Sequence, residues 1–158
     1  MRHPSLILLS HDHHHGLALA LRCRRQALGQ IKPMGAQGLK ERVKEYRDFF
    51  AQNLVPHFQA EEEILFPLIR ARAAGSHSLI DELFKDHEQL RKWEECLEED
   101  KGLAKVLFDI GDLLERHIRR EERELFPLFE NRVGAAEAER VKEEIEKILG
   151  VRNPKSKI

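Results

Sequence analysis

Residues 57–69 read HFQAEEEILFPLI, and residues 117–129 repeat this stretch as HIRREERELFPLF. The two copies share seven of thirteen residues, including the first His, the Glu four positions later and the Leu-Phe-Pro near the end. Each copy lies in a longer segment whose apolar residues recur every three or four positions, the period of a helix with one apolar face. The repeat therefore predicts two similar helices that run in the same direction, with one other helix between them in the chain.

The same period predicts four long helices in all. They cover residues 10–28 and 37–72 and two segments that begin at residues 81 and 102, and a shorter helix covers residues 137–149. Loop signals separate them, such as GQIKPMGAQG at residues 29–38. Since short loops favour antiparallel neighbours, the expected fold is all-α, an up-down antiparallel four-helix bundle with a short C-terminal fifth helix outside it. Ser10 is expected to cap the first helix.

Composition limits the class of protein. The chain has 158 residues, with 27 Lys and Arg against 28 Asp and Glu, and a net charge of −1. This balance argues against a dedicated nucleic-acid binder, which carries a basic excess. The longest aliphatic run, residues 6–9, is far shorter than the roughly 20 residues of a membrane span. We expect one domain at residues 1–150 and a polar tail at residues 151–158, with neither nucleic acid nor membrane as a partner.

The two cysteines indicate a compartment. Cys23 and Cys96 stand alone, without the spacing of a metal site or a disulfide framework. The first residues also lack the succession of basic, apolar and small residues that marks a secretory signal. Because unpaired thiols suit a reducing environment, we expect a cytoplasmic protein.

Polar residues interrupt the apolar stripes where core residues are expected. His57 and Glu61 are four residues apart, so their side chains lie one turn above the other on the same helix face. His117 and Glu121 repeat this arrangement, and His87 interrupts the stripe of the helix between them. Buried carboxylates are costly unless a cation compensates them. A bound metal would do so, because imidazole donates a lone pair and each Glu can bridge two neighbouring ions.

A cluster of histidines, SHDHHHG at residues 10–16, opens the first helix. Asp12 interrupts the cluster, and an apolar stripe follows it directly, which favours a native segment over an expression tag. Asp12 itself is expected either to cap the helix or to orient an imidazole ring.

His14 is taken as the metal ligand from this helix. It precedes Leu17 and Leu21 by three and seven residues and so continues their stripe, whereas His13 fits the stripe slightly less well. The alternatives that stay open, as ligands or as neighbours of a ligand, are His11, His13 and His15. The expected metal ligands are His14, His57, Glu61, His87, His117 and Glu121.

The other repeated residues have simpler interpretations. Surface charge is the interpretation for Glu62, Glu63, Glu122 and Glu124. Pro67 and Pro127 lack a backbone N–H and are expected to bend or end their helices.

Four stretches together, SHDHHHGLALAL, HFQAEEEILFP, KDHEQL and HIRREERELFP, resemble the hemerythrin-like (HHE cation-binding) family over nearly the whole chain. The resemblance implies a non-haem centre of two iron ions inside the bundle, with an oxo or hydroxo bridge. It also implies that Glu61 and Glu121 bridge the irons while the four His are terminal ligands. Manganese and zinc are less favoured alternatives for such a mixed ligand set.

The sequence departs from the oxygen-carrying hemerythrins, which have HxxxH on the third helix. Here Leu83 and Arg91 stand four residues before and after His87, so a second His is missing there. An incomplete ligand set leaves an open position on one iron, which argues against simple oxygen carriage. The resemblance then favours a protein that senses or reacts with oxygen, nitric oxide or peroxide, and the sequence does not identify a protein partner.

Two other functions remain open. One is a di-iron enzyme that reduces peroxide or oxygen, ranked lower because no Tyr or Cys lies one turn from the expected ligands. The other is a helical signalling module in which the metal only stabilises the bundle.

Overall fold

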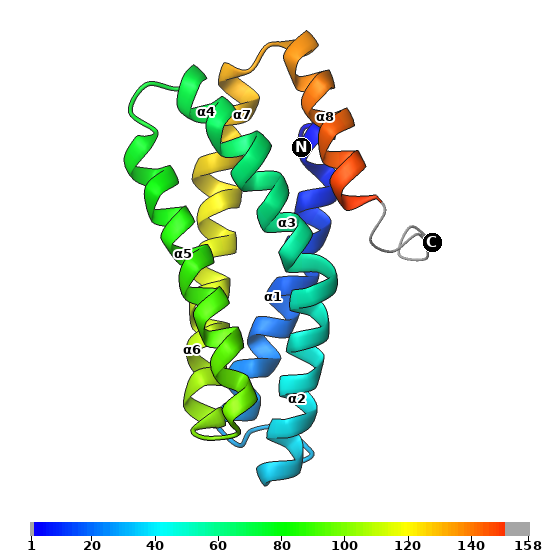
Figure 1. Ribbon diagram of the computed structural model, residues 1–158, viewed down its shortest axis with the longest axis vertical. Coiled ribbons are helices and arrows are strands. Elements are labelled where there is room, and N and C mark those ends of the chain that lie inside the picture. The colour runs from blue at the N-terminus through cyan, green and yellow to red at the C-terminus, as the bar shows by residue number, and fades with distance from the viewer. Residues whose placement is uncertain (1, 151–158) are drawn as a thin grey trace.

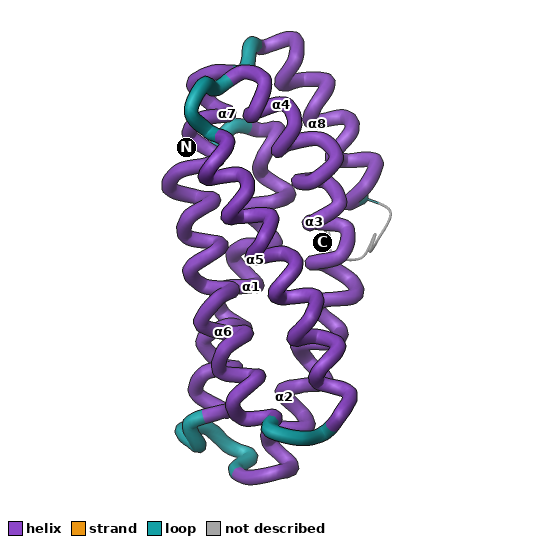
Figure 2. The backbone as a smooth tube through the Cα atoms, turned by 60° about the vertical axis from the view of Figure 1, so that its left-hand side comes forward, coloured by secondary structure: helices purple, strands orange, loops and turns teal. Residues whose placement is uncertain are grey.

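The computed structural model describes residues 2–150, and the expected polar tail at residues 151–158 lies outside them. The described chain forms four long antiparallel helical stretches and a shorter fifth one, with loops at both ends of the bundle (Figures 1 and 2). The elements are the short 3-10 turn η1 (Pro4–Leu6), α1 (Ile7–Ala27), α2 (Gly35–Phe49), α3 (Val55–Ala60), α4 (Phe66–Arg72), α5 (His77–Cys96), α6 (Leu103–Arg120), α7 (Phe126–Arg132) and α8 (Ala135–Leu149). The expectation of an all-α bundle is confirmed.

The first helix begins earlier than expected. Because α1 starts at Ile7, directly after η1, Ser10 lies inside the helix and does not cap it. The Ser10 hydroxyl instead donates a hydrogen bond to Glu122 Oε2 at 2.8 Å, across the bundle.

The second and fourth helical stretches contain π-helical turns. These are η2 (Phe50–Leu54), η3 (Glu61–Leu65) and η5 (Glu121–Leu125). The N–H of Phe66 bonds the carbonyl of Glu61, five residues back, and Phe126 does the same with Glu121. The next residue in each case is a proline, which has no N–H to donate. Pro67 and Pro127 therefore do not end their helices, which continue as α4 and α7 through one widened turn.

Two apolar cores fill the bundle. The α8 core lies at one end and includes Leu9, Leu65, Leu83 and Leu125, covered by Val141 and Ile145 of α8. The Tyr46 core lies at the other end and includes Cys23, Tyr46, Phe58, Leu90 and Leu114. Along each long helix, buried His or Glu residues separate the two cores. The expectation that the fifth helix packs on the outside agrees with the position of α8 against α3 and η1.

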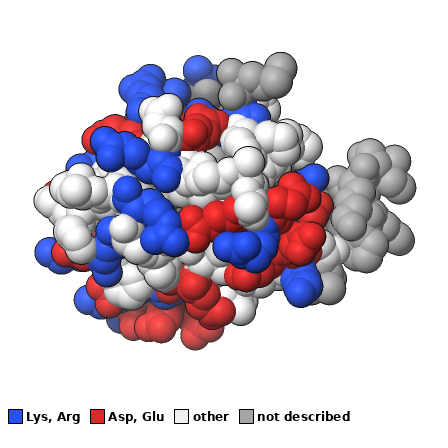
Figure 3. Space-filling view, turned by 90° about the horizontal axis from the view of Figure 1, so that it is seen from above, with Lys and Arg blue, Asp and Glu red and all other residues white. Residues whose placement is uncertain are grey.

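The surface carries charges of both signs. Basic and acidic side chains lie next to one another in the end view of Figure 3, and their total charges nearly cancel. Among the described residues, no helix is long and apolar enough to cross a membrane.

Candidate metal centre

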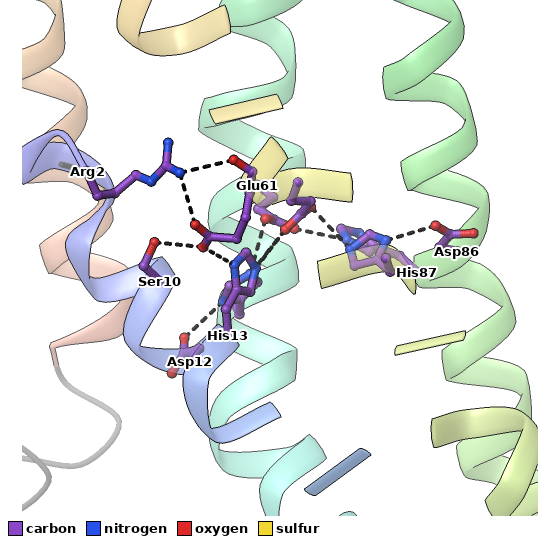
Figure 4. Close-up of polar contacts among 11 residues, drawn as sticks. Arg2, Ser10, Asp12, His13, Glu61, Asp86 and His87 are labelled. Atoms are coloured by element: carbon purple, nitrogen blue, oxygen red, sulfur yellow. Dashed lines mark hydrogen bonds and ion pairs between the residues drawn. The ribbon is translucent and has the colours of Figure 1, made fainter. Parts of the chain in front are cut away.

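Six polar side chains from all four long helical stretches meet between the two cores. They are His13, His57, Glu61, His87, His117 and Glu121, and all are buried. We call this set the histidine layer (Figure 4). The layer contains two groups of four residues whose ligand atoms lie within 4.8 Å of one another. One group combines His13 and His57 with both Glu, and the other combines His87 and His117 with the same two Glu.

Each Glu in the layer contacts one histidine of each group. Glu61 lies 3.1 Å from Nε2 of His57 on its own helix and 3.0 Å from Nε2 of His87 on α5. Glu121 lies 3.2 Å from Nε2 of His117 on its own helix and 2.8 Å from Nε2 of His13 on α1. Each Glu is therefore shared by the two groups, and each group combines two imidazole nitrogens with two carboxylates.

The structure does not bring His14 to the histidine layer and places His13 there instead. His14 is exposed, as are His11 and His15, whereas His13 is 4% exposed. The stripe that favoured His14 does not face the core, because Leu21 is 41% exposed. The core-facing stripe of α1 runs through Leu9, Gly16, Ala20 and Cys23, and His13 lies on it. The other five expected ligands meet as predicted.

In each of the four layer imidazoles, Nδ1, the ring nitrogen on the side away from the shared Glu residues, contacts a carboxylate. His57 Nδ1 lies 2.9 Å from Asp12, and His117 Nδ1 lies 2.9 Å from Asp86. His13 Nδ1 lies 2.6 Å from Glu122, and His87 Nδ1 lies 2.7 Å from Glu62. A carboxylate accepts a hydrogen bond from an N–H, so these contacts favour a proton on Nδ1 and direct Nε2 toward the layer. Each ring therefore turns Nε2, the atom that would bind a metal, toward the layer.

A family model, the hemerythrin HHE cation binding domain, matches residues 6–129, which is most of the chain and includes the whole histidine layer. The chain belongs to this family. Comparison with curated proteins and with solved structures finds no match.

The electrostatics of the histidine layer in this hemerythrin domain favour cations. Burial disfavours the imidazolium form of His117, but Glu121, Asp86 and Glu61 outweigh this effect and raise its pKa to about 10. Burial also opposes charge on His57, and its carboxylate neighbours raise its pKa well above the usual value. Burial opposes the charged form of Glu121, yet the histidines around it hold its pKa well below the usual value. The carboxylates therefore attract positive charge, which protons supply when no metal does.

Unpaired buried atoms show that the layer fits a metal. His87 Nε2, His117 Nε2, Glu61 Oε1 and Glu121 Oε2 are buried and have no hydrogen-bond partner. Buried polar atoms without partners are costly and rare. All four are donor atoms of the second group, so a metal ion there would satisfy them together.

Of the four carboxylates that contact Nδ1 atoms, sequence reasoning anticipated Asp12, as a residue that orients an imidazole ring, and missed the other three. Glu62 and Glu122 were expected to be surface charge, yet both are half-buried and contact an imidazole. A signal for the aspartates was present, because Asp12-His13 and Asp86-His87 are the same dipeptide on the first and third helices. Aligning these dipeptides selects His13 over His14.

Proposed function

We propose that this hemerythrin domain binds two iron ions and senses or reacts with a small ligand, namely oxygen, nitric oxide or peroxide. The observation that carries the proposal is the sharing of Glu61 and Glu121 by two buried His₂Glu₂ groups. His13 and His57 would hold one ion, and His87 and His117 the other. Mixed imidazole and carboxylate ligands suit iron. Iron bound in this way would supply the redox chemistry for a reaction with oxygen, nitric oxide or peroxide.

The protein residues contribute orientation and exclusion of water. The four carboxylates behind the rings fix each imidazole, which strengthens it as a ligand. Phe58 stacks on His87 with ring centroids 3.8 Å apart, and Phe126 stacks on His13 at 5.3 Å. The six side chains of the layer are at most 4% exposed, so the layer is closed to bulk solvent and only small molecules would reach it.

The number of protein donors favours a centre that senses or reacts with a small molecule over one whose metal ions are fully coordinated by the protein. Each ion would meet four protein donors, because Leu83, one turn before His87, is fully buried and supplies none. Octahedral iron would then keep positions for exogenous ligands. We further propose a cytoplasmic location, because Cys23 and Cys96 are both free thiols in the structure.

Metal analysis and optical spectra test this function. Protein prepared with iron should bind about two ions per chain and show the absorption of a bridged ferric pair, as two groups sharing two carboxylates require. Adding nitric oxide or peroxide should change that spectrum. Zinc alone, or an iron spectrum unmoved by each ligand, would contradict the proposal. The second result, combined with a lower melting temperature after chelation, would favour the metal-stabilised module instead.

A further inference from the structure

The face of α1 that points away from both cores carries a second stripe of residues. Seven exposed residues follow one another along it at alternating steps of four and three, from the start of α1 to the residue after its end. We call this set the outer stripe. Its members are Ile7, His11, His14, Ala18, Leu21, Arg25 and Leu28. Of the six large apolar side chains that are exposed in the described chain, three lie on the outer stripe, namely Ile7, Leu21 and Leu28.

The spacing of the outer stripe fits the surface of another helix. Alternating steps of four and three average 3.5 residues, the period of residues that pack against a partner helix in a coiled coil. Among the described residues, the main neighbours of α1 are α6 and α2, and both leave the outer stripe exposed. Single exposed apolar residues are ordinary, whereas a row aligned over about 30 Å of helix indicates an interaction surface.

The order of residues in the outer stripe fits a second copy of the same helix. The stripe has a large apolar residue at each end and a small one, Ala18, at its middle. When two copies of α1 lie antiparallel about a two-fold axis at Ala18, Ile7 of each copy meets Leu28 of the other. His14 then lies against Leu21, and the two Ala18 side chains let the helices approach closely. The same patch thus complements itself, as a two-fold interface requires.

Charge favours the antiparallel orientation over the parallel one. In a parallel pair, Arg25 of one copy would face Arg25 of the other, whereas in the antiparallel pair it faces an imidazole. Beside the outer stripe, Arg22 pairs with Glu45 and Arg24 pairs with Glu115 of the same chain, so the flanks of the interface are neutralised in advance. The dipoles of antiparallel neighbouring helices also attract one another.

We infer that the outer stripe of α1 binds a second copy of this chain and forms an antiparallel α1–α1 dimer. A contact of this length between two helices buries on the order of 1,000 Å² in total, the lower end of the range for specific interfaces. The dimer is therefore reversible and dissociates at micromolar concentrations. Asp12 and His13 are buried on the opposite face of α1, so the dimer leaves the histidine layer of each copy intact.

Sedimentation velocity of the full chain tests the dimer, with protein from about 1 to about 300 µM. The parent should pass from monomer to dimer over this range. Ala18→Glu places two like charges at the two-fold axis and should weaken dimerisation at least about tenfold. His14→Leu gives Leu21 an apolar partner and should strengthen it about tenfold. The control is Val55→Glu, at an apolar residue that is 49% exposed and lies off the stripe, and it should change the dissociation constant less than about twofold.

Cross-linking tests the orientation. Cys96 is exposed and is first replaced by Ser, while Cys23 is buried and stays. In this background, Ala18→Cys should form a disulfide between two copies under mild oxidation. Leu28→Cys should not link to itself but should link to Ile7→Cys chains mixed with it, because a disulfide needs Cα atoms within about 7 Å.

Three results would overturn the inference. A parent that stays monomeric at every concentration would leave the outer stripe to a helix of another protein. A dimer that Val55→Glu weakens and Ala18→Glu does not would place the interface elsewhere. Self-linking of Leu28→Cys would show a parallel pair. Every substituted residue of the stripe is exposed, so iron content, measured alongside, should equal that of the parent, and failure of the dimer would leave the proposed metal centre untouched.

Discussion

The histidine layer and the Tyr46 core are both buried, and both contain titratable groups. The layer favours the charged form of its groups, whereas the Tyr46 core favours the neutral form. Every layer imidazole has a carboxylate at Nδ1, and the carboxylates raise the pKa of His57 and His117 against the effect of burial. In the Tyr46 core, burial alone dominates and raises the pKa of the Cys23 thiol to about 12 and that of Tyr46 well above its usual value.

This difference shows which region is built for charge. The Tyr46 core keeps its thiol and phenol neutral, so it needs no counterion and behaves as ordinary apolar packing. The layer keeps Glu121 ionised and so needs a cation to offset its charge. Substitutions should therefore change metal binding in the layer and change only stability in the Tyr46 core.

The largest effect is expected for the bridging carboxylates. Glu61→Ala or Glu121→Ala removes a donor from both groups at once, so bound metal should fall from about two ions per chain to fewer than about one. Metal analysis of the purified variants checks this. The exposed residues Glu63 and Glu124 supply matched controls, since Glu63→Ala and Glu124→Ala remove charges that do not face the layer. Full metal content in Glu61→Ala would show that this carboxylate is not shared.

Two adjacent histidines test the register of α1. His13→Ala should lose the ion of the first group, because His13 Nε2 faces Glu121, whereas His14→Ala should keep full metal content, because His14 is exposed. Metal analysis and the optical spectrum of the two variants, prepared side by side, decide the matter. Metal loss in His14→Ala with normal loading of His13→Ala would restore the register that the leucine stripe suggested.

The register of α1 also shows where sequence reasoning ends. Apolar stripes predicted the four helices and five of the six layer residues, because those residues stand between apolar neighbours on both sides. In α1 the polar run at residues 10–15 contains no apolar residue, so the sequence does not show which of these residues face the core. The stripe of Leu17 and Leu21 therefore indicated the wrong face of α1, because Leu21 is 41% exposed.

The π-helical turns were beyond the pattern as well. A π turn adds one residue and rotates the following side chains, so a fixed step of three or four cannot register both halves of such a helix. Glu62 and Glu122 looked like solvated charge for a related reason. They are half-buried at the edge of the layer. At such positions the sequence pattern does not distinguish a solvated Glu from one that contacts a buried residue.

A smaller effect is expected for the carboxylates behind the rings. Asp86→Asn keeps the size of the side chain but weakens the hold on His117 Nδ1, so metal affinity should fall about 10- to 100-fold. Competition with a chelator of known affinity measures this change. Asp48→Asn, on an exposed side chain paired with Lys44, is the control and should leave affinity unchanged. If Asp86→Asn binds metal as tightly as the parent, the carboxylate serves packing alone.

The smallest effect is expected in the Tyr46 core. The Tyr46 hydroxyl is buried without a hydrogen-bond partner, so Tyr46→Phe removes a desolvated group and loses no bond. The free energy of unfolding should stay within about 1 kcal/mol of the parent value or rise, as expected when an unsatisfied polar group is removed. Tyr46→Ala leaves a cavity and should cost about 3–5 kcal/mol.

Denaturant unfolding of metal-loaded protein measures both Tyr46 variants, and metal analysis should find the same content in each, because Tyr46 lies in the apolar core and not in the layer. A clear loss of stability in Tyr46→Phe would mean that the hydroxyl has a partner. Loss of metal in that variant would mean that the Tyr46 core and the histidine layer are coupled, and the contrast between the two regions would then fail.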